Sequence, residues 1–417
     1  MAEGEESTRT RFGEYELVSR LAAGGMATVY IGRKPEDPAH GPVAIKVIHE
    51  HLSSDWEAMR WFIDEALISV RIRHPNVARV DELGEQDGLY YLAMEYVHGA
   101  SLAQLLSALA KRGRRLEPWL AVWIAARVAE GLHAAHELRG EEGELLNVIH
   151  RDISPQNVLL GHEGEVKLVD FGIAKAQGRA ERTKQGELRG KFRYMAPEQV
   201  MGGDQDRRID VFALGVVLWE MLTQKRMHGG LTPDELMDAV RAPAVERPST
   251  IRDDVPPGVE GILLNALAAR REERPHSAEV LRQELDAALA ANAPGFDGPV
   301  ALAGLMRDVL GPELLASAQR LPEDLAKAVG IEQLEPTIPR ARRDEETGKI
   351  IVEKAAPHAP GGDDAAAKAA SRQARREAKL RAREEAAEGG GRAWLWVGLL
   401  LLVAGGALAA LAWLALS

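Results

Sequence analysis

The stretch that decides the fold is HRDISPQN, residues 150–157, which leads through two short apolar runs to DFG at residues 170–172. The two runs predict short strands, so the motifs lie on loops beside them. These loops carry the carboxylates of Asp152 and Asp170 and the carboxamide of Asn157. Asp170 and Asn157 offer the hard oxygen ligands that Mg²⁺ on a nucleotide triphosphate requires. A carboxylate such as Asp152 can orient an incoming hydroxyl group.

A glycine-containing hairpin precedes these motifs. The sequence predicts a strand over Tyr15–Leu21, the turn AAGGMA at residues 22–27 and a second strand over Thr28–Gly32. Such a turn lets backbone N–H groups close over phosphate oxygens. Glycine-rich hairpins are also common without that role, so this segment alone leaves both interpretations open.

One lysine, Lys46, lies in the apolar strand expected over residues 43–46, VAIK. A buried ammonium group needs an anionic partner, because an unpaired buried charge is very costly. The helix expected over residues 56–73 offers Glu65. The alternative for Glu65 is a solvated helix face, and Glu65 by itself does not exclude that alternative.

Together with APE at residues 196–198, these ordered motifs resemble those of the bacterial eukaryotic-like (Hanks-type) Ser/Thr protein kinases, from about Tyr15 to Leu289. The resemblance implies an α+β fold of two lobes with the nucleotide between them. It also implies ATP and Mg²⁺ as cofactors and protein substrates as partners.

The resemblance assigns roles to single residues. Lys46 is expected to hold the α- and β-phosphates and to pair with Glu65, Asp152 to act as the catalytic base, and Asn157 and Asp170 to hold the metal. The residues expected to contact the nucleotide are Ala22, Ala23, Gly24, Gly25, Met26, Ala27, Val29, Ala44, Lys46, Met94, Glu95 and Val97.

Three further residues are implied to support the C-lobe. Glu198 is expected to pair with Arg274. Asp210, at the start of an apolar helix over Val211–Leu222, is expected to brace the catalytic loop.

The sequence departs from the family pattern at three places. The glycine-rich turn keeps only the middle glycine of G-x-G-x-x-G, which is Gly24. The catalytic loop has Ser154 where the family usually has lysine, and the segment before APE has Lys191 where it usually has threonine. We hypothesise that hydroxyl and ammonium have exchanged places, so that Lys191 reaches toward Asp152 and the transferring phosphoryl group. The alternative is independent drift, with Lys191 in solvent.

Arg151, next to the expected catalytic base, is typical of kinases whose activation segment is ordered by phosphorylation. Thr183 is the one hydroxyl residue of the segment over residues 172–190, which makes it the expected autophosphorylation site. A plain solvated threonine is the alternative.

The C-terminal part changes in composition. Residues 291–392 are rich in Ala, Pro, Gly and charge and are expected to be mostly a flexible linker, with short helices near Leu302–Leu315 and Leu325–Leu334. Residues 393–417 contain no charged side chain, and the expected transmembrane helix is long enough to cross a core of roughly 30 Å. The expected organisation is a disordered N-terminus (1–11), an N-lobe (12–96), a C-lobe (97–290), the linker (291–392) and the transmembrane helix (393–416).

Basic side chains before the apolar stretch place the preceding domain on the cytoplasmic side of a bacterial inner membrane. They are Lys368, Arg372, Arg375, Arg376, Lys379, Arg381, Arg383 and Arg392. A lipid bilayer is therefore an expected partner, and Gly405 and Gly406 are a weak signal for a homodimer. The net charge of −11 argues against nucleic acid as a partner. The absence of cysteine excludes disulfides and thiolate chemistry.

Two classes of function remain. An active protein kinase is favoured because Lys46, Glu65, Asp152, Asn157 and Asp170 are all present. The alternative is a membrane-bound pseudokinase scaffold that binds nucleotide without turnover, which the altered glycine-rich turn and the missing loop lysine favour. A small-molecule kinase is disfavoured by the long activation segment before the APE motif.

Overall fold

The structure is a computed structural model, and it describes residues 11–53, 56–171, 192–317, 340–343 and 350–353. The chain divides into two units, Met1–Ala355 and Ala356–Ser417, and every described residue belongs to the first. Thr183, Lys191 and the expected transmembrane helix over residues 393–416 lie outside the described residues. Within the described ranges, none of the helices has both the length and the apolar character needed to cross a bilayer.

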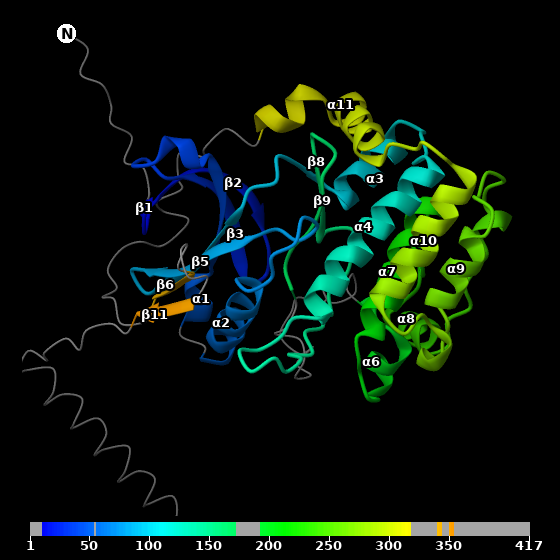
Figure 1. Cartoon of the computed structure of the whole chain (residues 1–417), viewed down its shortest axis with the longest axis horizontal. Coiled ribbons are helices and arrows are strands. Elements are labelled where there is room, and N and C mark those ends of the chain that lie inside the picture. Colours follow the sequence, from blue (N-terminus) through cyan, green and yellow to red (C-terminus); the bar gives the residue numbers. More distant parts are fainter. Residues whose placement is uncertain (1–10, 54–55, 172–191, 318–339, 344–349, 354–417) are drawn as a thin grey trace, which may run out of the picture. The chain divides into compact units, whose positions relative to one another are not determined.

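The first unit begins with a sheet-rich lobe and continues with a helical lobe (Figure 1). The strands of the first lobe are β1 (Arg11–Phe12), β2 (Tyr15–Ala23), β3 (Ala27–Arg33), β4 (Pro42–Ile48), β5 (Val80–Gln86) and β6 (Leu89–Glu95), with helices α1 (Glu50–Ser53) and α2 (Trp56–Ser69). The second lobe contains β7 (Gly99–Ser101), β8 (Val158–Gly161), β9 (Val166–Leu168), α3 (Leu102–Lys111), α4 (Pro118–His136), α6 (Pro197–Met201), α7 (Arg208–Thr223), α8 (Pro233–Arg241), α9 (Val259–Ala266), α10 (Ala278–Asn292) and α11 (Gly298–Ser317). Two later strands are β10 (Arg340–Arg343) and β11 (Ile350–Glu353).

The N-lobe sheet has the order β1-β2-β3-β4-β6-β5-β10-β11, with antiparallel neighbours. Strand β4 alternates between its two faces: Val43 and Ile45 pack in one apolar cluster with Tyr91, while Ala44 and Ile48 pack in the other. Because side chains alternate along a strand, Lys46 falls on the face of Ala44 and Ile48. Helix α2 covers that face with Met59, Phe62 and Ala66.

The C-lobe is built around α7, which lies among α4, α9 and α10 (Figure 1). Every residue of α7 from Ile209 to Thr223 is buried, and a helix that is apolar all round is stable only in such surroundings. Strands β7, β8 and β9 form a small separate sheet that carries the catalytic loop and the DFG motif at its ends. The strands and the helix expected from the sequence around these motifs are confirmed.

A buried ion pair fixes the lower part of this lobe. Arg274 donates through Nη1 and Nη2 to the two carboxylate oxygens of Glu198, at 2.7 and 2.8 Å. Arg274 also donates to the carbonyl oxygens of Ala268 and Ala269 and lies over the ring of Phe212. The expected pair is thus confirmed, and its remaining donors are satisfied, as a buried guanidinium requires.

Helix α11 corrects the domain boundary that the sequence suggests at residue 290. Leu302, Met306, Val309 and Leu310 are 0–5% exposed and belong to the main C-lobe cluster. Their spacing places them on one face of the helix, and α11 packs against α3, α4 and β8. The helix expected near Leu302–Leu315 is present, but residues 298–310 are part of the folded lobe and not of a linker.

Truncating this face should destabilise the protein. Met306→Ala removes a fully buried side chain and is expected to lower the free energy of unfolding by about 2–5 kcal/mol, measured by urea denaturation of the full chain. Val300→Ala on the same helix is the control, because Val300 is 65% exposed and its truncation should change stability by less than about 0.5 kcal/mol. Equal effects of the two substitutions would contradict the packing of α11.

Candidate active site

The two lobes meet at Lys46. Its Nζ lies 3.2 Å from Oε1 of Glu65 on α2 and 2.8 Å from Oδ1 of Asp170 in the DFG motif. Burial disfavours the charged form of Lys46, but the carboxylates of Asp170 and Glu65 outweigh this effect and raise the pKa of Lys46 above its ordinary value. The expected pair of Lys46 with Glu65 is confirmed, and Asp170 is a second partner of the same ammonium group.

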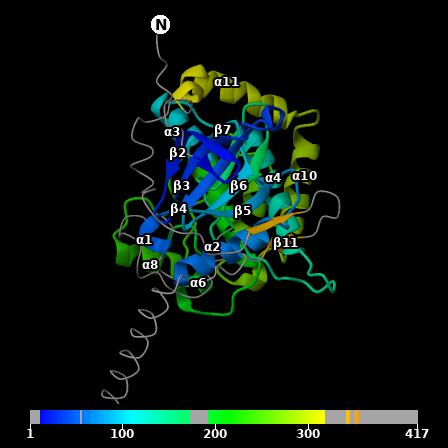
Figure 2. The same cartoon turned by 90° about the vertical axis from the view of Figure 1, so that its left-hand side faces the viewer.

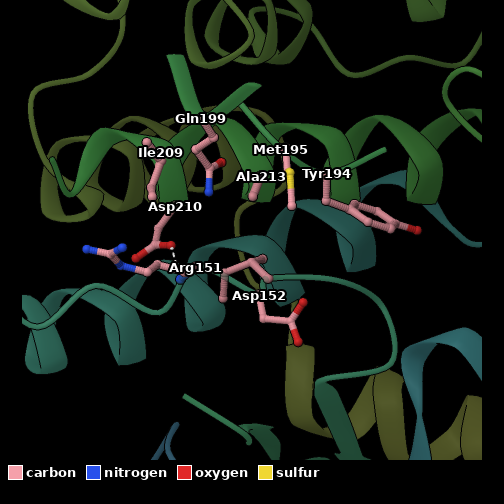
Figure 3. Close-up of a pocket in the computed structure, with 9 residues that line it drawn as sticks. Arg151, Asp152, Tyr194, Met195, Gln199, Ile209, Asp210 and Ala213 are labelled. Carbon is pink, nitrogen blue, oxygen red and sulfur yellow. Dashed lines mark hydrogen bonds between the residues drawn. The ribbon is translucent and has the colours of Figure 1, made fainter. Parts of the chain in front are cut away.

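The catalytic loop is held from below by Asp210, the fully buried carboxylate near the start of α7 (Figure 3). Its Oδ2 accepts from the backbone N–H of His150 at 2.7 Å and from Nε2 of His136 at 2.8 Å, and its Oδ1 accepts from the N–H of Arg151 at 2.8 Å. Burial opposes the charge of Asp210, yet these donors lower its pKa below the ordinary value. Asp210 braces the loop, as the resemblance implied.

Two residues of the site have backbone conformations that are uncommon for side chains other than glycine. Arg151 has a φ of 63° and Asp170 a φ of 58°, both in the left-handed region. Such conformations persist where the surroundings determine them. Here the hydrogen bonds of Asp210 and Lys46 hold the two turns, and Figure 3 shows the Asp152 side chain leaving the loop on the side away from Asp210.

His150 joins the catalytic loop to the DFG motif in its neutral form. Its Nδ1 accepts from the N–H of Asp152 at 3.3 Å, and its Nε2 donates to the carbonyl oxygen of Val169 at 3.1 Å. Burial lowers the pKa of His150, which suits a ring with one accepting and one donating nitrogen. The ring also packs against Phe171, with 4.6 Å between centroids.

The donor set of Asn157 and Asp170 fits a hard divalent cation. The amide nitrogen of Asn157 donates to the carbonyl oxygen of Asp152 at 2.8 Å, which fixes the orientation of the carboxamide and leaves Oδ1 as the oxygen available to a ligand. Asp170 contributes a carboxylate that is 41% exposed. Mg²⁺ typically takes one or two such protein oxygens and completes its shell with phosphates and water.

The expected adenine region lies on β4 and β6. Ala44 is paired with Met94, and Val29 with Lys46, in the ladders of β4. Met94 is buried and lines a small cavity that extends to Asp170 and Phe171. Glu95 ends β6 and is held by Lys167, with 2.6 Å between Nζ and Oε1. These contacts place the expected gatekeeper and hinge residues beside the Lys46 site.

The glycine-rich turn is closed by its own backbone and by a histidine that the motif search missed. Gly24 N–H donates to the carbonyl oxygen of Ala27 at 2.9 Å. His49, just after β4, donates its N–H to the carbonyl oxygen of Met26 at 2.9 Å, and its Nε2 lies 3.0 Å from Oγ1 of Thr28. The half-buried position of His49 and the nearby His51 lower its pKa. A neutral imidazole therefore anchors the turn at physiological pH.

A second network supports the segment before APE. Tyr194 OH donates to Oε2 of Glu220 at 2.9 Å, and Met227 N–H donates to Oε1 of the same carboxylate at 3.0 Å. Tyr194 lines a cavity together with Asp152 and Gln199 (Figure 3). The carboxylate of Glu220 thus fixes a wall of the space in front of Asp152.

The exchange hypothesis for Ser154 and Lys191 keeps its standing as a prediction. Ser154 is half-buried in the catalytic loop, and its carbonyl oxygen accepts from Asn157 N–H at 3.0 Å. Lys191 and the activation-segment residue Thr183 lie outside the described residues.

This geometry defines the class of the protein, which is a two-lobed phosphotransferase domain with its site at the lobe junction. The sequence profile of the protein kinase domain matches residues 15–285, and the chain belongs to the protein kinase family.

Three similar proteins place the chain among bacterial members. It is 38% identical over 313 residues to the tyrosine-protein kinase MasK of Myxococcus xanthus, covering 75% of this chain and 48% of that protein. It is 31% identical over 341 residues to the serine/threonine-protein kinase PrkC of Bacillus subtilis, covering 81% and 49%. The crystal structure of the Mycobacterium tuberculosis PknI kinase domain is 28% identical with a TM-score of 0.51, covering 69% and 99%. The chain spans about half the length of these two curated relatives.

The anchoring of the turn by His49 can be tested through nucleotide affinity. His49→Ala removes one hydrogen bond to Thr28, which is worth about 0.5–1.5 kcal/mol, so ATP should bind about 2- to 10-fold more weakly in a calorimetric or fluorescence titration. His51→Ala is the matched control and should leave the affinity unchanged, while His49→Gln should restore part of it. Equal affinity of the wild type and His49→Ala would show that the histidine does not anchor the turn.

Proposed function

We propose that the chain transfers the γ-phosphoryl group of ATP to a hydroxyl group of a protein substrate. The observation that carries this proposal is the position of Lys46, whose ammonium group bridges Glu65 of the N-lobe and Asp170 of the C-lobe. An inert scaffold needs no such link between a phosphate-binding lysine and a metal-binding carboxylate. The family membership of the chain supports the same activity.

Each residue has a defined task in this proposal. Lys46 binds and orients the α- and β-phosphates, and Glu65 holds its ammonium group in place. Asp152 accepts the proton of the incoming hydroxyl group as the oxygen attacks the γ-phosphorus and the bond to the β-phosphate oxygen breaks. Asn157 and Asp170 would hold Mg²⁺, which neutralises the developing phosphate charge when bound.

Ser154 leaves this site without the usual loop cation. Charge stabilisation is the main catalytic contribution in phosphoryl transfer, so a lower rate or a substitute cation follows from this position. Lys191 is the candidate substitute, and Thr183 is the candidate autophosphorylation site that orders the activation segment.

The acceptor hydroxyl group is the finer part of the proposal. PrkC and PknE are named serine/threonine-protein kinases, while MasK is named a tyrosine-protein kinase. The motif order of the sequence favours serine or threonine, but Ser154 occupies the position whose lysine is typical of that class. We therefore propose Ser/Thr as the principal acceptors.

We further propose that a single helix over residues 393–416 anchors the protein in the bacterial inner membrane, with the kinase lobes in the cytoplasm. The uncharged stretch, its flanking tryptophans Trp394, Trp396 and Trp413 and the basic flank before it support this topology. Two anchored copies could meet as a homodimer in the plane of the bilayer.

The activity is tested by transfer of radiolabel from γ-labelled ATP by the full chain. Asp152→Asn is expected to lower the rate by about 10²–10⁴-fold, the usual contribution of a positioned base, while nucleotide affinity stays the same. Phosphoamino-acid analysis of the labelled product identifies the acceptor, and phosphoserine or phosphothreonine is expected.

The competing scaffold function predicts a different outcome of the same assay. A pseudokinase would bind ATP and Mg²⁺ but label neither itself nor a generic basic protein, in the wild type as in Asp152→Asn. That result would replace the kinase proposal with the scaffold.

The membrane anchor is tested by carbonate extraction of membranes that contain the full chain. Replacing both Leu402 and Leu408 by Arg should release the protein, because each arginine at the centre of a span costs about 2.5–3.5 kcal/mol. Ala386→Arg lies outside the apolar stretch and should leave the protein in the membrane fraction. Extraction of the wild-type chain would contradict the anchor.

A further inference from the structure

The outer edge of the N-lobe sheet is occupied by a segment far beyond the kinase domain. Strand β10 pairs antiparallel with β5, and β11 pairs with β10, so that a two-stranded hairpin extends the sheet (Figure 2). These strands begin more than 50 residues after the kinase-domain match ends at residue 285. The described N-lobe without them would end at β5.

An exposed β5 would be a liability. Alternate N–H and C=O groups of β5 point away from β6 and need a partner. Strand β5 has the sequence VDELGEQ, with one tight position at Gly84, where an added Cβ would lie 2.3 Å from the hydroxyl oxygen of Tyr91. Pairing with β10 satisfies backbone groups along this edge.

The register brings opposite charges together. Strand β10 has the sequence RARR, while β5 contains Asp81, Glu82 and Glu85. Arg342 is the direct register partner of Glu82, and Ala341 is the partner of Leu83. Opposite charges at directly facing positions of antiparallel strands stabilise the pairing, so the sequence of β10 matches the edge it occupies.

The other end of the same segment is fixed to the C-lobe. In α11, the backbone carbonyl of Asp308 accepts from Nη1 of Arg112 at 2.8 Å, and its carboxylate pairs with Arg114. The apolar face of α11 is buried in the C-lobe cluster. The segment after the kinase domain therefore contacts the C-lobe through α11 and the N-lobe through β10.

The edge strand is coupled to the helix that carries Glu65. Val80 and Leu83 of β5 lie in one apolar cluster with Met59, Phe62 and Ala66 of α2. Glu65 belongs to the same helix as these three residues and pairs with Lys46. Ordering β5 thus stabilises the surface on which the Glu65 helix rests.

We propose that the β5 edge is a strand-docking site and that its occupant is residues 340–353 of the same chain. Docking ties the region after the kinase domain to both lobes and restrains the α2 surface behind the Lys46–Glu65 pair. Because α11 anchors the segment next to its site, the intramolecular occupant has a high effective concentration and outcompetes a strand from another molecule. This assignment does not depend on phosphoryl transfer.

Hydrogen–deuterium exchange of the full chain tests the assignment. Ala341→Pro removes a ladder N–H from the central strand of the three, β5-β10-β11, and should speed exchange in peptides covering residues 80–86 at least tenfold. Ala366→Pro is the matched control, since it places the same residue elsewhere in the C-terminal region, and should leave β5 protected. Peptides from α7 report whether both variants remain folded.

Two results would overturn the proposal. Equal β5 protection in Ala341→Pro and Ala366→Pro would mean that residues 340–353 do not occupy the edge. Protection that rises with protein concentration, together with a doubled mass in light scattering, would mean that a second copy supplies the strand.

The charge match is tested separately by Arg342→Glu and Arg342→Lys. The first places like charges at facing positions and should speed β5 exchange, more so at low salt, while the second should keep the protection of the wild type. Equal exchange in both variants would remove the electrostatic part of the argument for β10 as the occupant.

Discussion

The buried carboxylate of Asp210 is the constraint on which the catalytic loop depends. A charge without solvent must be matched by donors, and three are supplied by the side chain of His136 and the backbone of His150 and Arg151. Two of these donors are the loop itself, so the loop cannot relax without leaving Asp210 unpaired. The uncommon backbone conformation of Arg151 follows from this requirement, and Asp152 and Asn157 take their positions from the turn that results.

The N-lobe adds a second constraint through one ammonium group. Strand β4 places Lys46 on the face covered by α2, and the carboxylates that neutralise it come from both lobes. The arrangement of the lobes and the electrostatics of the site are therefore the same problem. Anything that shifts α2 changes the partners of Lys46, which is why the edge strand β5 and its neighbour β10 matter to the site although they lie outside it.

Much of the site was predictable because its chemistry is concentrated in short motifs. Lys46, Asp152, Asn157 and Asp170 are fixed by residue type and order along the chain, and the structure places them as expected. His136 and His49 were not predictable in this way. A histidine in an apolar helix and a histidine after a strand carry no local signal of their partners, since Asp210 and Thr28 are brought to them only by folding. The apolar spacing of Leu302, Met306 and Val309 did signal a helix, but not the lobe surface that buries it.

The sequence by itself determined the protein kinase fold, the identity of the phosphate- and metal-binding residues and the position of the uncharged C-terminal stretch, because each depends on residue type and local spacing. Only the tertiary structure decided that Lys46 bridges two carboxylates, that α11 belongs to the C-lobe and that residues 340–353 extend the sheet at β5. These features join segments separated by 19 to more than 200 residues. Pairing over such distances depends on which surfaces folding leaves exposed, and local patterns do not encode it.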